Sequence, residues 1–246
     1  MQKKTMGLNA LQLKILAMLC MLLDHMWATI IHGNDWMTCV GRLAFPIFAF
    51  QIAEGYAHTS DPKAYRRRLL LWALVTEIPF NLMLTGGLIY PFHQNVLFTF
   101  WLSLLIIGRV DRARERGGLL GLVFAAGWLL AGYVLGFAGF VDYYGYGILM
   151  VVLFHLFREN KLGQLIFMFL VNVVWMKGLG YPVTVLGHEF FLPQQAFAMF
   201  ALIPIWLYNG EQGPYNKTIR RLCYAFYPAH ILALVMIGWI ASFCLN

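Results

Sequence analysis

The sequence predicts an all-α membrane protein, a polytopic bundle of about nine transmembrane helices (eight to ten) that forms one integral membrane domain over residues 1–246. Hydrophobic residues make up 61% of the chain and charged residues only 12%, whereas soluble domains carry about 25% charged residues. The apolar runs are continuous and about 17–24 residues long, which fits a hydrocarbon core about 30 Å thick. A membrane β-barrel would instead show short segments of alternating hydrophobicity.

Apolar segments recur along the whole chain. The first follows a basic N-terminus, as in a signal peptide, but no small-residue cleavage site comes after it, so we expect it to be retained as a helix. Pro46 lies inside the second segment and predicts a kink there. The sixth and seventh segments are short, so one of them is expected to be tilted, re-entrant or broken. The nine segments are 9–31, 37–57, 66–84, 94–110, 118–140, 143–157, 162–177, 193–208 and 220–244.

Basic residues mark one side of the predicted bundle. The formal net charge is +7, and all but three of the 18 Lys and Arg residues lie on the same side as Lys3 and Lys4 when the segments alternate. The exceptions are Lys14, Arg42 and Lys177. This positive-inside pattern predicts a cytoplasmic N-terminus and an external C-terminus. The lipid bilayer therefore accounts for the basic charge, and no nucleic-acid partner is expected.

Signatures of several other chemistries are absent from the sequence. The four cysteines (Cys20, Cys39, Cys223 and Cys244) show no CxxC spacing and no cluster with histidine, so no metal is expected. There is no Walker-type phosphate loop, dinucleotide glycine fingerprint, HExxH or GxSxG motif. These absences argue against ATP-driven transport and against common soluble hydrolases.

Ionisable residues lie inside the first two apolar segments, on either side of a short polar corner. Asp24 and His25 precede the corner and Arg42 follows it, so all three lie at similar depth if each residue advances about 1.5 Å along a helix. Ionisable groups inside a membrane usually face a protein interior or a wet cavity and indicate a functional site. Two structural alternatives stay open. His25 could be a packed histidine that hydrogen-bonds to a backbone carbonyl. Arg42 could form a structural ion pair with Asp24 or Glu77.

The third and fourth segments add further polar residues. Glu77 is an acid within the third segment, and Asn95, Thr99 and Ser103 recur at i, i+4 and i+8 in the fourth. This spacing predicts a polar stripe on one face of a helix. The stripe either bonds neighbouring helices or lines a cavity.

Two further histidines are candidates. His230 follows Tyr227 on the same face of the last segment and lies near mid-membrane. His32 lies at the polar corner, two helical turns beyond His25. The histidines expected to be peripheral are His93, His155 and His188.

Six motifs stand in order over nearly the whole chain. They are LDH (23–25), GRLAFPIFAFQIAEGYAHT (41–59), QNVLFTF (94–100), DYYGYGILM (142–150), NG (209–210) and FYPAH (226–230). Together they closely resemble the TraX family, which is named for conjugal-transfer proteins that N-acetylate the pilin amino terminus. The resemblance implies a multi-pass protein of the plasma (inner) membrane. It marks Asp24, His25, Gly41, Arg42, Phe45, Pro46, Glu54, Gly55, Gln94, Asn95, Asp142, Gly145 and His230.

A shorter stretch is similar to transmembrane acetyltransferases of the heparan glucosaminide type. Those proteins carry a histidine at the outer corner before an F-P-x-F-x-F segment, as His32 precedes residues 45–50 here. Arg42 stands where that family has an acid. This similarity makes His32 a rival to His25 for handling the acyl group.

These observations together predict a membrane-embedded acyltransferase that takes an acetyl or other acyl group from cytoplasmic acyl-CoA. The acceptor is an amine or hydroxyl of a pilin-like peptide, a glycan or a small molecule at the outer side. His25 is the expected base or acyl carrier, because an imidazole gains and loses a proton near neutral pH. Asp24 or Glu77 would orient the His25 ring. His32 and His230 are the alternative imidazoles for the role of base or acyl carrier. The groups expected to bind the acyl-CoA are Arg42, Asn95 and Tyr227.

Two other classes of protein stay open. Buried charges and kinked helices also suit a small transporter or flippase, although no inverted repeat is visible. A noncatalytic membrane protein of envelope assembly is the third class, and for it His25→Ala would be silent.

Overall fold

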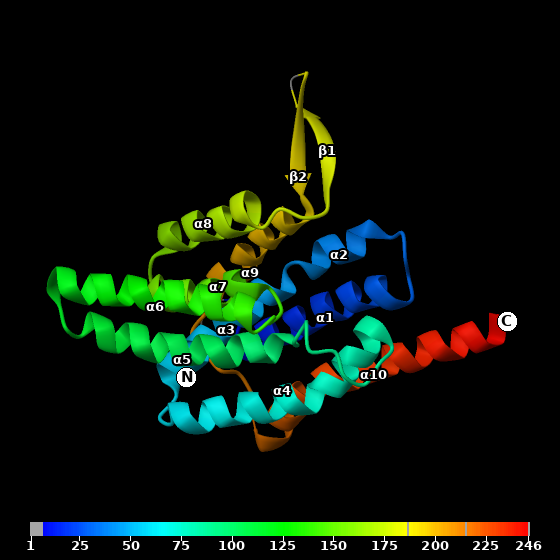
Figure 1. The fold of residues 1–246 in the computed structure, drawn as a ribbon, viewed down its shortest axis with the longest axis horizontal. Coiled ribbons are helices and arrows are strands. Elements are labelled where there is room, and N and C mark those ends of the chain that lie inside the picture. Colours follow the sequence, from blue (N-terminus) through cyan, green and yellow to red (C-terminus); the bar gives the residue numbers. More distant parts are fainter. Residues whose placement is uncertain (1–6, 186, 215, 246) are drawn as a thin grey trace. The chain divides into compact units, whose positions relative to one another are not determined.

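The computed structural model describes residues 7–185, 187–214 and 216–245. Within these residues, helix occupies each of the nine predicted apolar segments, so the predicted all-α class is confirmed (Figure 1). Lys3, Lys4 and Asn246, on which part of the topology prediction rests, lie outside the described residues. The elements are α1 (Ala10–Thr29), α2 (Asp35–Gly41), α3 (Ala44–His58), α4 (Pro62–Thr85), α5 (Val96–Arg114), α6 (Gly118–Ala138), α7 (Tyr144–Leu156), α8 (Lys161–Phe169), the π-helix η1 (Leu170–Trp175), β1 (Gly180–Val185), β2 (His188–Pro193), the 3-10 helix η2 (Gln194–Ala201), α9 (Leu202–Trp206) and α10 (Lys217–Leu245).

The chain divides into two compact units, whose boundary falls within α3. The terminal unit comprises Met1–Gln51 together with Asn160–Asn246, and the central unit comprises Ile52–Glu159. Each unit has its own polar side-chain contacts. That the two make one membrane domain stays a prediction.

Five helical stretches of the described residues are long and apolar enough to cross a membrane. They are Ala10–Thr29, Asp35–His58, Pro62–Thr85, Gly118–Ala138 and Lys217–Cys244. The shorter apolar helices lie at Tyr144–Leu156, Lys161–Trp175 and Gln194–Trp206. α5 is long as well, but its last turns carry several charges. The chain is therefore a membrane protein.

The second predicted segment is not one continuous helix. α2 ends at Gly41 and α3 begins at Ala44, so the break falls at Arg42 and Leu43. Pro46 was expected to kink this segment and to free a carbonyl, and the break agrees with that expectation. A proline has no N–H to give to the carbonyl four residues earlier, so the interruption reaches back to Arg42. The break places the Arg42 guanidinium at the end of a short helix.

In the central unit, α5 packs against α4, α6 and α7, and α6 also packs against α7. Figure 1 shows α5 and α6 side by side. The buried face of α6 carries only small residues, namely Gly121, Ala125, Gly132 and Gly136. A Cβ at Gly136 would stand 2.6 Å from the backbone of Gly145. Small side chains thus allow the close helix contacts that are common in membrane bundles.

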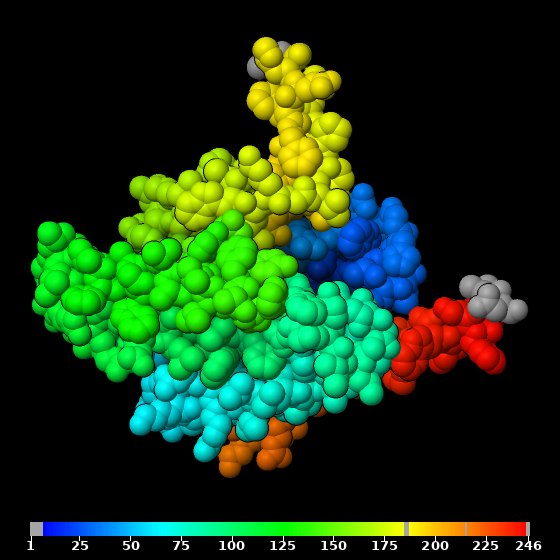
Figure 2. All heavy atoms as spheres, viewed as in Figure 1, coloured from blue at the N-terminus to red at the C-terminus, as the bar shows by residue number. Residues whose placement is uncertain are grey.

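In the terminal unit, α1 packs against α2 and α10. β1 and β2 form an antiparallel hairpin in which Gly180 pairs with Pro193 and Val185 with His188. Its strands are rich in β-branched and aromatic residues, which favour extended structure. Figure 2 shows the hairpin as a narrow projection from the rest of its unit.

Candidate functional site

Two histidines from opposite ends of the terminal unit's sequence form a pair. His25 on α1 and His230 on α10 stack with their ring centroids 4.9 Å apart and their planes 8° from parallel. Nδ1 of His25 lies 2.8 Å from Nε2 of His230. Nδ1 of His230 lies 2.7 Å from the backbone oxygen of Phe226. The packing of α1 against α10 creates this contact.

The hydrogen bonds fix the tautomer of each neutral ring. A carbonyl oxygen can only accept, so Nδ1 of His230 donates to Phe226 and its Nε2 is left as an acceptor. Nδ1 of His25 must then donate to His230. Nε2 of His25 consequently carries an unprotonated lone pair. Within the described residues no side chain or backbone group hydrogen-bonds to this nitrogen, and the residue is only half-buried.

Two aromatic rings lie beside the histidine pair. Phe226 stacks on His230 with ring centroids 4.7 Å apart. Tyr227 is buried, and its centroid lies 6.3 Å from that of His25 and 5.8 Å from that of His230. The predicted site residue Tyr227 therefore lies beside both imidazoles.

Asp24 and Arg42 form the predicted ion pair. Nη2 of Arg42 donates to Oδ1 of Asp24 at 2.8 Å and contacts Oγ1 of Thr38 at 2.9 Å. The Thr38 hydroxyl donates to the same carboxylate oxygen at 2.6 Å. Asp24 also lies directly against Gly41, where an added Cβ would overlap its side chain. The four residues lock α1 onto α2 and hold the guanidinium near the break before α3.

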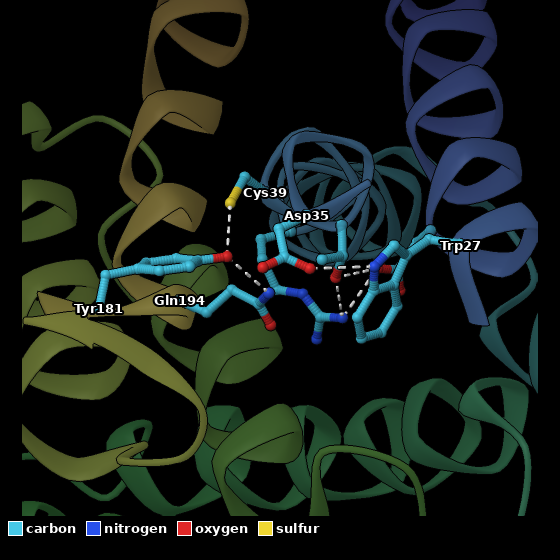
Figure 3. A network of polar contacts seen from close by, with 8 residues as sticks. Trp27, Asp35, Cys39, Tyr181 and Gln194 are labelled. Atoms are coloured by element: carbon cyan, nitrogen blue, oxygen red, sulfur yellow. Dashed lines mark hydrogen bonds and ion pairs between the residues drawn. The ribbon is translucent and has the colours of Figure 1, made fainter. Parts of the chain in front are cut away.

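A second set of polar contacts joins the hairpin to α2 (Figure 3). The Tyr181 hydroxyl contacts the thiol of Cys39 at 3.5 Å and accepts a bond from Gln194 at 3.2 Å. The contact with Cys39 raises the pKa of Tyr181 above its ordinary value. The Trp27 indole on α1 donates to Asp35 at 3.3 Å. The Tyr181–Cys39 contact holds the base of the hairpin next to α2, and the Trp27–Asp35 bond joins α1 to α2.

Asn95 and Glu77 make a separate cluster in the central unit. Nδ2 of Asn95 donates to Oε2 of Glu77 at 2.6 Å and to the backbone oxygen of Ala73 at 2.8 Å. Its Oδ1 accepts from the backbone of Leu97 at 3.1 Å and caps α5. Both amide hydrogens of Asn95 are thus in use. Thr99 donates to the backbone oxygen of Asp142, in the connection between α6 and α7, at 2.6 Å. Because Asn95 bonds to Ala73 and Glu77 on α4, the stripe does bond a neighbouring helix, which was one of its two predicted roles.

His93 was predicted to be peripheral, but it contacts other side chains of the central unit. Nε2 of His93 lies 3.5 Å from Oδ1 of Asp142. Hydrogen bonding to this carboxylate raises the pKa of His93 above its ordinary value, although burial acts to lower it. The ring also stacks on Phe80 with centroids 5.6 Å apart. The Asp142 carboxylate is therefore paired with His93, close to the start of α5.

The segment after α6 is strained. Phe140, Tyr143 and Tyr144 have φ values of 49°, 58° and 48°, in a region that residues other than glycine rarely adopt. Gln94 holds this segment by accepting from the backbone of Asp142 at 2.9 Å and by donating to that of Phe140 at 2.8 Å. Strain of this kind persists only where the surrounding structure enforces it.

The predicted site residues fall in both units of the chain. Asp24, His25, Arg42, Tyr227 and His230 lie in the terminal unit, whereas Glu77 and Asn95 lie in the central unit. His32 is exposed in the turn after α1. Asp24 makes no hydrogen bond to the His25 ring among the described residues, and that Glu77 orients His25 stays a prediction. Both carboxylates contact other groups, and the His25 ring contacts His230. Asp24 points away because adjacent helix positions differ by about 100°.

Thr38 was missed by the sequence analysis. Its only signal was the four-residue spacing to Arg42, which places two side chains on one helix face. The Phe226 carbonyl, which fixes the tautomer of His230, has no side-chain signal at all.

Comparison with known proteins identifies the family. The family model described as "TraX protein" matches residues 10–238. The chain belongs to the TraX family. The match includes both histidines of the pair and the Asp24–Arg42 ion pair. The resemblance inferred from the motifs is therefore confirmed.

A curated relative extends this TraX assignment. The chain is 26% identical over 259 residues to the "Probable fimbrial assembly protein FimC, serogroup H1" of Dichelobacter nodosus, covering 94% of this chain and 96% of that protein. No solved structure matches the chain.

Proposed function

We propose that this TraX-family protein is an acyltransferase of the plasma membrane that moves an acetyl group from acetyl-CoA to an amino group of a fimbrial subunit. The observation that carries the proposal is the His25–His230 pair, because it leaves an unprotonated nitrogen on His25, which lies beside the Tyr227 ring. Such a nitrogen is a general base or a nucleophile.

The transfer balances with the groups present. Nε2 of His25 takes a proton from the acceptor amine as the amine nitrogen attacks the thioester carbonyl. A carbon–nitrogen bond forms, the carbon–sulfur bond breaks, and the thiolate of CoA leaves and takes up the proton. The hydrogen bond to His230 keeps the His25 ring fixed during this step. Fixed orientation accounts for a large part of enzymatic rate enhancement.

Arg42 is the candidate for stabilising negative charge on the thioester oxygen or the leaving thiolate. Thr38 and Asp24 hold its guanidinium in place, so little reorganisation is needed as charge develops. Asn95, the other predicted group for this role, already uses both amide hydrogens on Glu77 and Ala73. We therefore assign Asn95 a structural role and leave it out of the proposed transfer.

The proposed acceptor follows from the relatives. The Dichelobacter nodosus protein is named for fimbrial assembly, and the TraX resemblance implies acetylation of a pilin amino terminus. The basic residues predicted to face the cytoplasm suit an acyl-CoA that carries phosphates. The acceptor then approaches from the opposite side or from within the bilayer.

The test is acyl transfer by the purified protein in detergent or lipid nanodiscs. We expect acetyl-CoA and a peptide with a fimbrial amino terminus to give acetylated peptide by mass spectrometry and an equal amount of free thiol. A panel with amine and hydroxyl glycans and longer acyl-CoA molecules defines the substrates. Absence of transfer from every acyl-CoA, combined with no thermal stabilisation by CoA, would contradict the proposal.

A noncatalytic role in fimbrial assembly is the second candidate, since the relative's name describes assembly. It predicts that variants lacking His25 still support assembly. The transfer assay and an assembly assay on the same variants separate the two functions.

A further inference from the structure

A hollow in the central unit is lined by arginines and aromatic rings. It has a volume of about 150 Å³ and lies where α5 ends and α6 begins. Its lining residues are Arg109, Arg112, Ala113, Arg116, Phe124 and Trp128. The distribution of Lys and Arg predicts that this end of the two helices faces the cytoplasm.

The spacing of the residues creates the hollow. Arg109 and Arg112 recur at i and i+3 on one face of α5, and Arg116 follows in the turn between α5 and α6. Phe124 and Trp128 recur at i and i+4 on α6, which packs against α5. The guanidinium carbon of Arg109 lies 5.1 Å from the centre of the Trp128 ring, and that of Arg116 lies 4.4 Å from the centre of the Phe124 ring.

The three positive charges have no carboxylate partner in the part of the chain that the structure describes. Asp111, on the same helix, is engaged by His155 at 2.9 Å. All three arginines are exposed. An arginine stacked on a ring keeps its edge N–H groups available for two parallel bonds to a phosphate. Stacking also reduces the side-chain freedom that is lost when a ligand binds.

A simpler role explains only part of this arrangement. Arginines at the cytoplasmic end of a helix favour the observed orientation and interact well with the helix dipole. Neither effect requires the arginines to converge on a hollow or to stack on Phe124 and Trp128. Convergence of three cations beside two apolar rings instead suits a ligand with both a phosphate and an apolar or planar part.

We propose that the arginine–aromatic hollow binds the phosphate group of a small amphiphilic or nucleotide ligand at the cytoplasmic surface. Two sources share this chemistry, namely the headgroup of an anionic phospholipid and the phosphates of a nucleotide such as CoA. The site stands independently of the acyl transfer proposed above, because a lipid would bind there whether or not the protein is an enzyme.

The experiment measures binding of both sources to the full-length protein. CoA and ADP are titrated by calorimetry in a neutral detergent, and phosphatidylglycerol is compared with phosphatidylcholine by native mass spectrometry. We expect R109Q/R112Q/R116Q to weaken binding of at least one phosphate source by about tenfold or more, since several charge-assisted hydrogen bonds are lost. The variant F124L/W128L should weaken binding less, because it keeps the charges.

The matched control is K217Q/R220Q/R221Q, which removes three exposed basic residues predicted to lie on the same membrane side. We expect this control to bind both sources as the native protein does. R109K/R112K/R116K keeps the charge but lacks the bidentate fork, so it tests the site even if the glutamine variant does not fold. Loss in the CoA arm or in the lipid arm supports the site and identifies its source. Unchanged binding in both arms, or equal loss in the control, would overturn the proposal.

Discussion

His25→Gln is expected to lower the rate of acyl transfer by about 10²–10⁴-fold, the range typical of a general base. The loss should appear in kcat, because the imidazole acts on the proton that moves in the transition state. His230→Phe should cause a smaller loss. It keeps an aromatic ring beside His25 but removes the nitrogen that lies 2.8 Å from Nδ1 of His25. The measurement is initial rate against acetyl-CoA concentration.

Two further histidines provide the comparison for this prediction. His188 lies exposed in the hairpin, so His188→Gln should transfer acyl groups at the native rate. His32→Gln decides between the two imidazoles favoured by the two family resemblances. We expect it to retain activity, because His32 is exposed in the turn. Full activity of His25→Gln together with inactivity of His32→Gln would contradict the assignment.

Gly41→Ala is expected to destabilise the terminal unit by about 1–3 kcal/mol, the usual cost of overpacking. Its new Cβ would overlap the Asp24 side chain and stand 2.7 Å from Oδ1, the oxygen that accepts from both Thr38 and Arg42. The carboxylate must move, and its two hydrogen bonds weaken with it. Unfolding in a denaturing detergent, followed by circular dichroism, measures the change.

The matched control for this variant is Gly127→Ala. Gly127 lies inside α6, and a Cβ there would meet nothing within 4 Å. The substitution should leave stability unchanged or raise it, since alanine favours helix by about 1 kcal/mol over glycine. Equal stability of the Gly41→Ala and native proteins would show that Asp24 does not lie against this helix.

The helices and the Asp24–Arg42 ion pair could be predicted because both leave local signals in the sequence. Long apolar runs indicated each helical segment, and the Asp24–Arg42 pair followed from two charges on either side of one corner. The two residues are 18 positions apart, so only one helix pair had to be placed.

The histidine pair could not be predicted in the same way. His25 and His230 are 205 positions apart, and nothing in the spacing of either helix states that α1 packs on α10. Asp24 or Glu77 was expected to orient His25, and no local pattern pointed to a partner on the last helix. The hairpin at 180–193 was also missed, since its residues stand in a stretch expected only as a connection.

The most direct test of the central claim is nitrogen NMR of the protein labelled with ¹⁵N-histidine, with the two signals assigned by His25→Gln and His230→Phe. Our account predicts that both neutral rings carry their proton on Nδ1, that a hydrogen bond joins Nδ1 of His25 to Nε2 of His230, and that Nε2 of His25 is unprotonated. A proton on Nε2 of neutral His25, or a His25 signal that does not change when His230 is replaced, would contradict it.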